Sequence, residues 1–199
     1  MSGALGLLVP LVACTTPAPP DDSSVVADPV DTAAEALAAD DAAIRALDGA
    51  VLPAGANPCA PVERVRVYRV VDGDTLYVTP DGGGTTRKVR LIGVDTPEIA
   101  HDDPAECWGD EAWSYTERAL EGRLAWLTYD AECTDRYDRV LAYLHRGADA
   151  DGFYNRRLVR DGQATAFPVR PNTAFQTAFE SDERAARDAD RGLWGRCAH

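Results

Sequence analysis

The sequence predicts an α+β protein built on a five-stranded OB-like β-barrel with about three helices. Two observations predict this class. Short apolar segments with strand-like alternation begin after residue 61, and stretches of helical periodicity are interspersed with them. The expected strands cover residues 65–71, 76–78, 89–94, 124–127 and 140–144.

Three helices are expected between and after these strands. The first covers residues 110–120, and the second covers residues 153–160 before a stop at Gly162. The last covers residues 173–190, with Thr173-x-x-Gln176 as a capping box at its start.

The first thirteen residues are typical of a signal peptide. Their apolar run, residues 4–13, is too short to span a bilayer as a mature helix. The run ends in Leu-Val-Ala-Cys, which resembles the lipobox of bacterial lipoproteins, although no Lys or Arg precedes it. Cys14 is then the lipidation site and the mature N-terminus. The alternative is a simple cleaved secretory signal in which Cys14 has no role.

Residues 14–58 are rich in Ala, Pro and Asp and contain no aromatic residue. Such a segment buries too little apolar surface to order itself, so we expect a largely disordered acidic tether, with a transient helix as an alternative over residues 32–47. The globular domain is expected over residues 59–199. This organisation predicts a protein exported to the bacterial cell envelope and lipid-anchored there, or secreted.

Four further cysteines occur in the expected domain, and an even count in an exported chain indicates disulfides. Four cysteines allow three pairings. We favour Cys59–Cys197, which ties the two ends of the domain, together with Cys107–Cys133. A zinc site is the alternative, but no C-x-x-C spacing supports it.

Three motifs carry candidate chemistry: Val-Asp-Gly-Asp-Thr at 71–75, Arg-Leu-Ile-Gly-Val-Asp-Thr-Pro-Glu at 90–98, and Asp-Arg-Tyr-Asp-Arg at 135–139. A hard divalent cation prefers several oxygen ligands. Asp74 and Asp95 supply carboxylates, and the following proline restricts Thr96 so that its carbonyl direction is fixed. Taken alone, Asp-Gly-Asp-Thr is more often only a turn.

Glu98 is a third carboxylate, free to orient or deprotonate a water. Arg90 and Arg139 can bind phosphate oxygens through the planar guanidinium fork and stabilise developing charge. Arg90 and Asp95 are five residues apart, so on a flat strand they point to opposite faces. They converge only if the chain bends between them, and Gly93 is the expected position of that bend.

Taken together, the motifs resemble the active site of the staphylococcal (thermo)nuclease family, over roughly residues 62–194. The resemblance implies calcium as cofactor and hydrolysis of DNA and RNA by in-line attack of water at the 5′-oxygen bond, leaving 3′-phosphates. It implies that the calcium ligands are Asp74, Asp95 and the Thr96 carbonyl, and that the catalytic residues are Arg90, Glu98 and Arg139.

The resemblance also implies substrate contacts. Tyr137 would lie beside the substrate phosphate, and Phe167 would either stack on a base or be a half-buried core aromatic. Separately from the resemblance, Arg170 is a local positive charge that would attract the substrate. Two positions depart from the family pattern. Asp138 replaces a glycine, where Asp tolerates a left-handed backbone comparatively well, and Val169 replaces a second stacking tyrosine.

The negative net charge of the chain lowers the affinity that we expect for nucleic acid. The chain carries a net charge of −13, and its first sixty residues hold eight acids against one arginine, so the remaining residues carry −6. Proteins that bind the nucleic-acid backbone are usually basic. We therefore expect weak binding of DNA or RNA with low sequence specificity. Separately, we expect the protein to be a monomer. The competing prediction is a non-catalytic OB-like envelope lipoprotein that binds nucleic acid or a partner and keeps a structural metal site.

Overall fold

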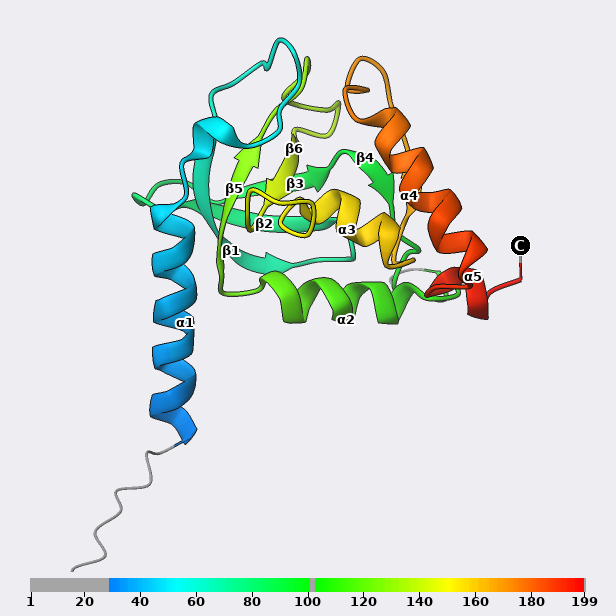
Figure 1. Cartoon of the computed structure of the whole chain (residues 1–199), viewed down its shortest axis with the longest axis horizontal. Coiled ribbons are helices and arrows are strands. Elements are labelled where there is room, and N and C mark those ends of the chain that lie inside the picture. The colour runs from blue at the N-terminus through cyan, green and yellow to red at the C-terminus, as the bar shows by residue number, and fades with distance from the viewer. Residues whose placement is uncertain (1–28, 101–102, 199) are drawn as a thin grey trace, which may run out of the picture.

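A closed five-stranded barrel forms the centre of the structure, a computed structural model that describes residues 29–100 and 103–198 (Figure 1). Its strand order is β1-β2-β3-β6-β5, antiparallel throughout except for the parallel pair β3–β6. This topology confirms the predicted OB-like α+β class. The barrel strands are β1 (Glu63–Val70), β2 (Thr75–Pro80), β3 (Arg87–Leu91), β5 (Leu124–Thr128) and β6 (Val140–His145).

Alternate residues of these strands face the barrel interior, as the period of two in the sequence requires. The interior is closed by apolar side chains from helices, Leu120 and Leu158, and both are fully buried. The buried strand residues at the centre of the core are Val65, Val67, Leu76, Val78, Val89 and Leu91.

A second, two-stranded sheet pairs β4 (Gly93–Asp95) with β7 (Thr165–Phe167). The sequence predicted one continuous strand here, and the structure divides it because the chain leaves the barrel after β3. Gly93 has φ +81°, and a Cβ on it would lie 2.2 Å from a ring carbon of Phe179. Only glycine tolerates both the positive φ and the close approach of the Phe179 ring, so Gly93 permits the chain to pass from the barrel to the small sheet.

The three predicted helices are α2 (Gly109–Leu120), α3 (Tyr154–Arg160) and α4 (Gln176–Asp188), and the described chain also contains α1 and a single-turn α5 (Leu193–Arg196). The predicted capping box is wrong. Helix α4 begins three residues later than expected, and Thr173 accepts the Gln176 N–H through its backbone carbonyl at 3.1 Å instead of through its side chain. No helix in the described part of the chain has the length and hydropathy needed to cross a membrane.

Residues 29–58 differ from the predicted disordered tether. Helix α1 (Pro29–Ala46) and a 3-10 turn (Gly49–Val51) precede the barrel. Figure 1 shows α1 projecting away from the barrel, with only its C-terminal end against it. The rest of the predicted tether and the signal peptide, including the lipidation candidate Cys14, lie outside the described residues.

Ion pairs fix the C-terminal end of α1 to the barrel. Asp41 pairs with Arg66 of β1 at 2.5 Å, and Asp40 contacts both Arg123, at 3.3 Å, and Arg146. Two of the acidic residues in the predicted tether, Asp40 and Asp41, therefore form ion pairs with arginines on or next to the barrel strands. Sequence reasoning missed this contact because the partners are far apart along the chain.

The disulfide pairing in the structure corrects the predicted one. The bonds join Cys59 to Cys133 and Cys107 to Cys197, with Cα–Cα distances of 5.7 and 5.9 Å. Strand pairing explains the first bond: β1 lies beside β5, so the segment before β1 runs along the end of β5. There the Cys59 N–H donates to the Asp130 carbonyl at 2.7 Å.

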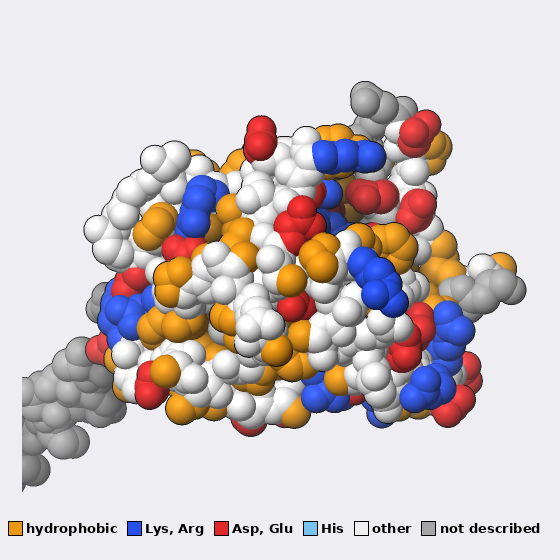
Figure 2. All heavy atoms as spheres, turned by 90° about the horizontal axis from the view of Figure 1, so that it is seen from above, with side chains coloured by type: hydrophobic (Ala, Val, Ile, Leu, Met, Phe, Trp, Pro, Cys, Tyr) orange, Lys and Arg blue, Asp and Glu red, His pale blue; other side chains and the backbone are white. Residues whose placement is uncertain are grey.

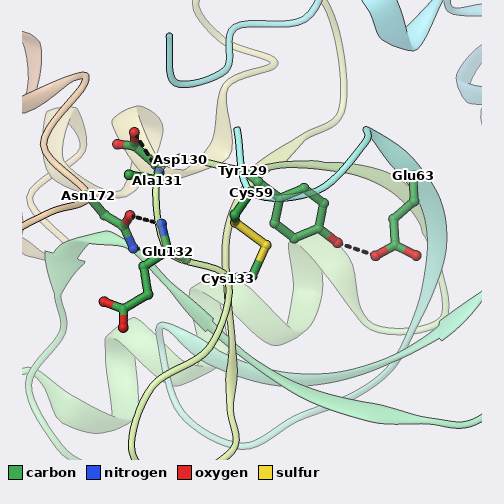
Figure 3. The surroundings of a disulfide bond; sticks show 8 residues. All are labelled: Cys59, Glu63, Tyr129, Asp130, Ala131, Glu132, Cys133 and Asn172. Carbon is green, nitrogen blue, oxygen red and sulfur yellow. Dashed lines mark hydrogen bonds between the residues drawn. A yellow bond between two sulfur atoms is a disulfide. The ribbon is translucent and has the colours of Figure 1, made fainter. Parts of the chain in front are cut away.

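Figure 3 shows the surroundings of the first disulfide, where Asn172 is hydrogen-bonded to the backbone of Glu132 next to Cys133. The second disulfide forms because the loop after β4 and the C-terminal segment lie on the same side of the small sheet. There, Cys107 and Cys197 share a hollow with Thr165. With all four cysteines paired, the zinc alternative is excluded.

Replacing Ile44 with Ala tests the docking of α1. Ile44 is 3% exposed, and its carbonyl accepts the Trp126 indole N–H at 3.0 Å. Because a buried side chain is truncated, we expect the free energy of unfolding to fall by about 2 kcal/mol or more, measured by urea denaturation. Leu37→Ala is the matched control, since Leu37 is 39% exposed on the same helix. Equal, small effects of the two substitutions would contradict the docked arrangement.

Candidate active site

The turn between β1 and β2 presents two buried carboxylates. Asp72 Oδ1 accepts the Asp74 N–H at 3.0 Å, and the Thr116 hydroxyl of α2 donates to the Gly73 carbonyl at 2.7 Å. A Cβ on Gly73 would lie 2.6 Å from the Thr96 methyl group. Gly73 therefore serves the close approach of the second motif as well as the turn.

Asp74 joins the first two motifs. Its Oδ2 accepts both the backbone N–H and the hydroxyl of Thr96, at 2.9 and 3.1 Å. Asp74 is 4% exposed, whereas Asp95 is half-buried and the Glu98 side chain is exposed. The predicted metal-ligand residues thus lie side by side: Asp74 and Thr96 are buried, and Asp95 is partly exposed to solvent.

Arg90 contacts both aspartates. Its Nε lies 3.0 Å from Asp74 Oδ1, and one terminal nitrogen lies 2.6 Å from Asp95 Oδ1. The other terminal nitrogen donates to the carbonyls of Leu91 and Val94, at 2.5 and 2.8 Å. Arg90 therefore fills the inside of the bend, and the convergence that strand parity required is present.

Negative charge is in excess at this site. The pKa of Asp74 is raised to about 7, chiefly by burial; Arg90 opposes the rise, and Asp72 and Asp95 contribute to it. Burial also raises the pKa of Asp95 and of Glu98, and neighbouring carboxylates add to both shifts. One guanidinium does not balance these carboxylates, so the site favours an additional positive charge.

The donor set fits a hard cation, because the candidate ligands are oxygen atoms only. Asp74 and Asp95 are the carboxylates that would hold it, with the Thr96 carbonyl as the third donor. Within residues 29–100 and 103–198, no group of three or more acidic, histidine or cysteine side chains converges as a metal cluster. Two carboxylates and a backbone oxygen are consistent with that finding.

The third motif forms a tight loop between β5 and β6. Asp135 accepts the backbone N–H groups of Tyr137 and Arg139, at 2.9 and 3.0 Å, and pairs with the Arg139 guanidinium at 2.7 Å. Asp138 has φ +58°, the left-handed conformation that a glycine would adopt without strain. The loop thus holds Arg139 in place while leaving part of its guanidinium open.

A groove of about 440 Å³ joins the second and third motifs. Arg90 and Arg139 both line it, and three exposed side chains, Tyr137, Phe167 and Arg170, lie along its walls. The metal-ligand candidates and Glu98 are not among the lining residues, and Arg90 is the link between them and the groove. All of the sequence-predicted substrate contacts therefore meet in one place.

The surface around the loops is mixed in charge. Figure 2 looks down on the loops at the top of Figure 1, and acidic side chains are interspersed there with lysines and arginines. In the groove itself, Glu132 and Asp135 oppose the arginines. This face carries no continuous basic band, as the net charge of the chain predicts.

Sequence reasoning missed two residues that support the site. Asp135 shapes the arginine loop, and its place two residues before Tyr137 in the motif is a turn signal that could have revealed it. Asn155 donates to the Ile92 carbonyl at the bend and accepts the Leu144 N–H, both at 2.9 Å. It lies inside a predicted helix, where no local pattern marks it.

An OB-like barrel with two arginines at a groove, one of them paired with two carboxylates beside it, is consistent with one class of protein: hydrolases that act as nucleases. Comparison with known proteins gives the family. Residues 88–196 match the model of the family described as staphylococcal nuclease homologue, and the chain belongs to that family.

Individual relatives agree with this assignment. The thermonuclease of Staphylococcus hyicus is 37% identical over 130 residues, covering 65% of this chain and 74% of that protein. The thermonuclease of Staphylococcus intermedius is 36% identical over 135 residues, covering 67% and 77%. The endonuclease YncB of Bacillus subtilis is 30% identical over 141 residues, covering 68% and 63%.

Replacing Asp74 with Asn tests the electrostatic account. The pKa of Asp74 is raised from its ordinary value of 3.8 to about 7 in the folded chain. Between these two pH values the folded chain therefore binds more protons at Asp74 than the unfolded chain. The stability of the calcium-free protein therefore falls as pH rises through this window. The variant should lose this dependence of stability on pH, because Asn does not titrate. Urea denaturation across the window measures it. Asp103→Asn, at an exposed position, is the control, and an unchanged pH dependence in Asp74→Asn contradicts the account.

Proposed function

We propose that this nuclease is a calcium-dependent phosphodiesterase that hydrolyses DNA or RNA to products with 3′-phosphates. The observation that carries the proposal is the position of Arg90, which contacts Asp74 and Asp95 and also lines the groove. A phosphate bound in that groove would lie against a guanidinium that is already oriented by two carboxylates.

The groove supports binding of a single strand with little sequence preference. Phe167 offers an exposed ring, which can stack on any base, and exposed Tyr137 lies beside the arginines that would bind the phosphate. Arg136 lies over the Tyr137 ring at 4.7 Å and Arg139 at 5.5 Å, so the aromatic and cationic surfaces are continuous. No constellation of base-reading donors is required for this mode of binding.

The chemical step is assigned to three side chains. Glu98 orients the attacking water and accepts its proton, a role that suits a carboxyl whose pKa is raised by burial and by its acidic neighbours. Arg90 and Arg139 bind the phosphate oxygens and stabilise the charge that develops on them. Calcium, when bound, supplies further positive charge at the same phosphate. Asp74, Asp95 and the Thr96 carbonyl would hold it.

We also propose that the protein is exported and held at the bacterial cell envelope through lipidated Cys14, or secreted, and that it acts as a monomer. Two disulfides are consistent with an oxidising compartment. The apolar run of residues 4–13, which ends in Ala13 directly before Cys14, supports export and lipidation.

Degradation of single-stranded DNA tests the mechanism. We expect activity with calcium, none with EDTA, and a loss of about 100-fold or more in kcat for Glu98→Gln, because the amide cannot accept a proton. Glu111→Gln, on the exposed start of α2, should keep full activity. Activity that persists in EDTA or in Glu98→Gln would refute the proposed chemistry.

Asp138→Asn tests the effect of the acidic loop on substrate binding. Asn keeps the tolerance for φ +58° and removes one negative charge beside the arginines. We expect a KM for single-stranded DNA lowered by about 2- to 5-fold at low salt, with kcat and stability little changed. Asp103→Asn removes the same charge at another exposed position and serves as control. A KM for Asp138→Asn that equals that of the parent protein would show that this charge does not weaken the grip.

A further inference from the structure

Glu98 and Glu106, which are eight positions apart in the sequence, are joined by two hydrogen bonds. The Glu98 N–H donates to Glu106 Oε2 at 3.1 Å, and the Glu106 N–H donates to the Glu98 carbonyl at 2.9 Å. Both backbone polar groups of Glu98 are therefore bound by one residue. The side chain of Glu98 is exposed, so its position depends on how its backbone is held.

The start of α2 supports this pair from behind. Gly109 donates its N–H to the Glu106 carbonyl at 3.0 Å. A Cβ on Gly109 would lie 2.2 Å from the Glu98 carbonyl oxygen, so the helix backbone packs directly against Glu98. Helix α2 also holds the Gly73 carbonyl through Thr116, at 2.7 Å. One rigid element thus contacts both the Glu98 backbone and the turn that carries the buried aspartates.

A covalent bond fixes the same point from the other side. Cys107, the residue after Glu106, is joined to Cys197 near the end of the chain. The Cys197 N–H donates to the Leu193 carbonyl, and the Leu193 N–H donates to the Gly162 carbonyl, both at 2.9 Å. The C-terminal segment that carries Cys197 is therefore itself hydrogen-bonded to the turn after α3.

We propose that Glu106 is a positioning residue for catalysis: its carboxylate and its N–H fix the backbone of Glu98 against α2, and the Cys107–Cys197 disulfide holds Glu106 in register. The proposal rests on the proposed role of Glu98. Positioning needs an acceptor oxygen at residue 106 and does not need a charge. This separates it from an electrostatic role, in which the carboxylate would act through its charge on the nearby carboxylates of Asp95 and Glu98.

Paired substitutions at Glu106 separate these roles. Glu106→Ala removes the acceptor and the charge, whereas Glu106→Gln keeps an acceptor oxygen for the Glu98 N–H. With single-stranded DNA and saturating calcium, we expect Glu106→Ala to lower kcat by about 10- to 100-fold while KM changes by less than about 2-fold. Glu106→Gln should stay within about 3-fold of the parent protein, and Asp103→Ala, in the same loop, should be unchanged.

Amide hydrogen exchange tests the positioning role of Glu106 without measuring activity. The amide proton of Glu98 should exchange faster with solvent in Glu106→Ala and in the double variant Cys107→Ser with Cys197→Ser than in Glu106→Gln, while amides of the barrel strands stay protected. This comparison also shows that the variants are folded. If Glu98 exchanges equally in Glu106→Ala and the parent protein, Glu106 does not hold it and the proposal fails.

A double-mutant cycle with Glu98→Gln distinguishes failure of this proposal from failure of the proposed function. If Glu106 acts through Glu98, adding Glu106→Ala to Glu98→Gln causes no further loss of kcat. A further 10-fold loss in that background means that Glu106 acts elsewhere and overturns the positioning role. Equal losses in Glu106→Ala and Glu106→Gln overturn it as well, in favour of charge. Full activity in Glu98→Gln alone would instead remove the base assignment on which the proposal rests.

Discussion

The site depends on the ion pairs of Arg90 with Asp74 and Asp95. Asp74 is buried, and an isolated carboxylate there would carry a large desolvation cost. Arg90 reduces that cost, yet the pKa of Asp74 remains raised, so compensation is incomplete. The same arginine bonds the carbonyls of the bend between β3 and β4 and thereby sets the direction in which the chain leaves the barrel. Arg90 thus both compensates the charge of the aspartates and fixes the path of the chain at the bend. The negative charge that remains uncompensated favours binding of a cation.

The two parts of the proposed chemistry lie on different elements. Asp74 lies in the turn between β1 and β2, which Thr116 of α2 holds, and Asp95 lies on β4 of the small sheet. The arginine of the third motif lies on a loop that Asp135 shapes through three contacts. The groove between them is open and mixed in charge, so substrate binding rests on a few local contacts and not on a broad electrostatic field.

Local patterns predicted most of the fold. Alternation gave the barrel strands, helical periodicity gave three helices, and the parity argument with Gly93 predicted the bend beside Arg90. The disulfide pairing was wrong because it depends on which chain segments meet: β1 lies beside β5, and this brings Cys59 to Cys133. The docking of α1 escaped prediction for the same reason, since its acidic residues pair with Arg66 of β1 and with Arg123 and Arg146, which flank β5 and β6 and which only the closed barrel brings together. The residue roles at the site and the N-terminal anchor remain predictions.

The bond between Cys59 and Cys133 has a mechanical consequence. Residue 59 immediately precedes the barrel, so tension on the N-terminal segment reaches this covalent link before it reaches β1. The load passes into the connection between β5 and β6, and the ion pairs of α1 with Arg66, Arg123 and Arg146 share it. The disulfide thus transfers part of any tension on the N-terminal segment to the connection between β5 and β6, so β1 does not carry it alone.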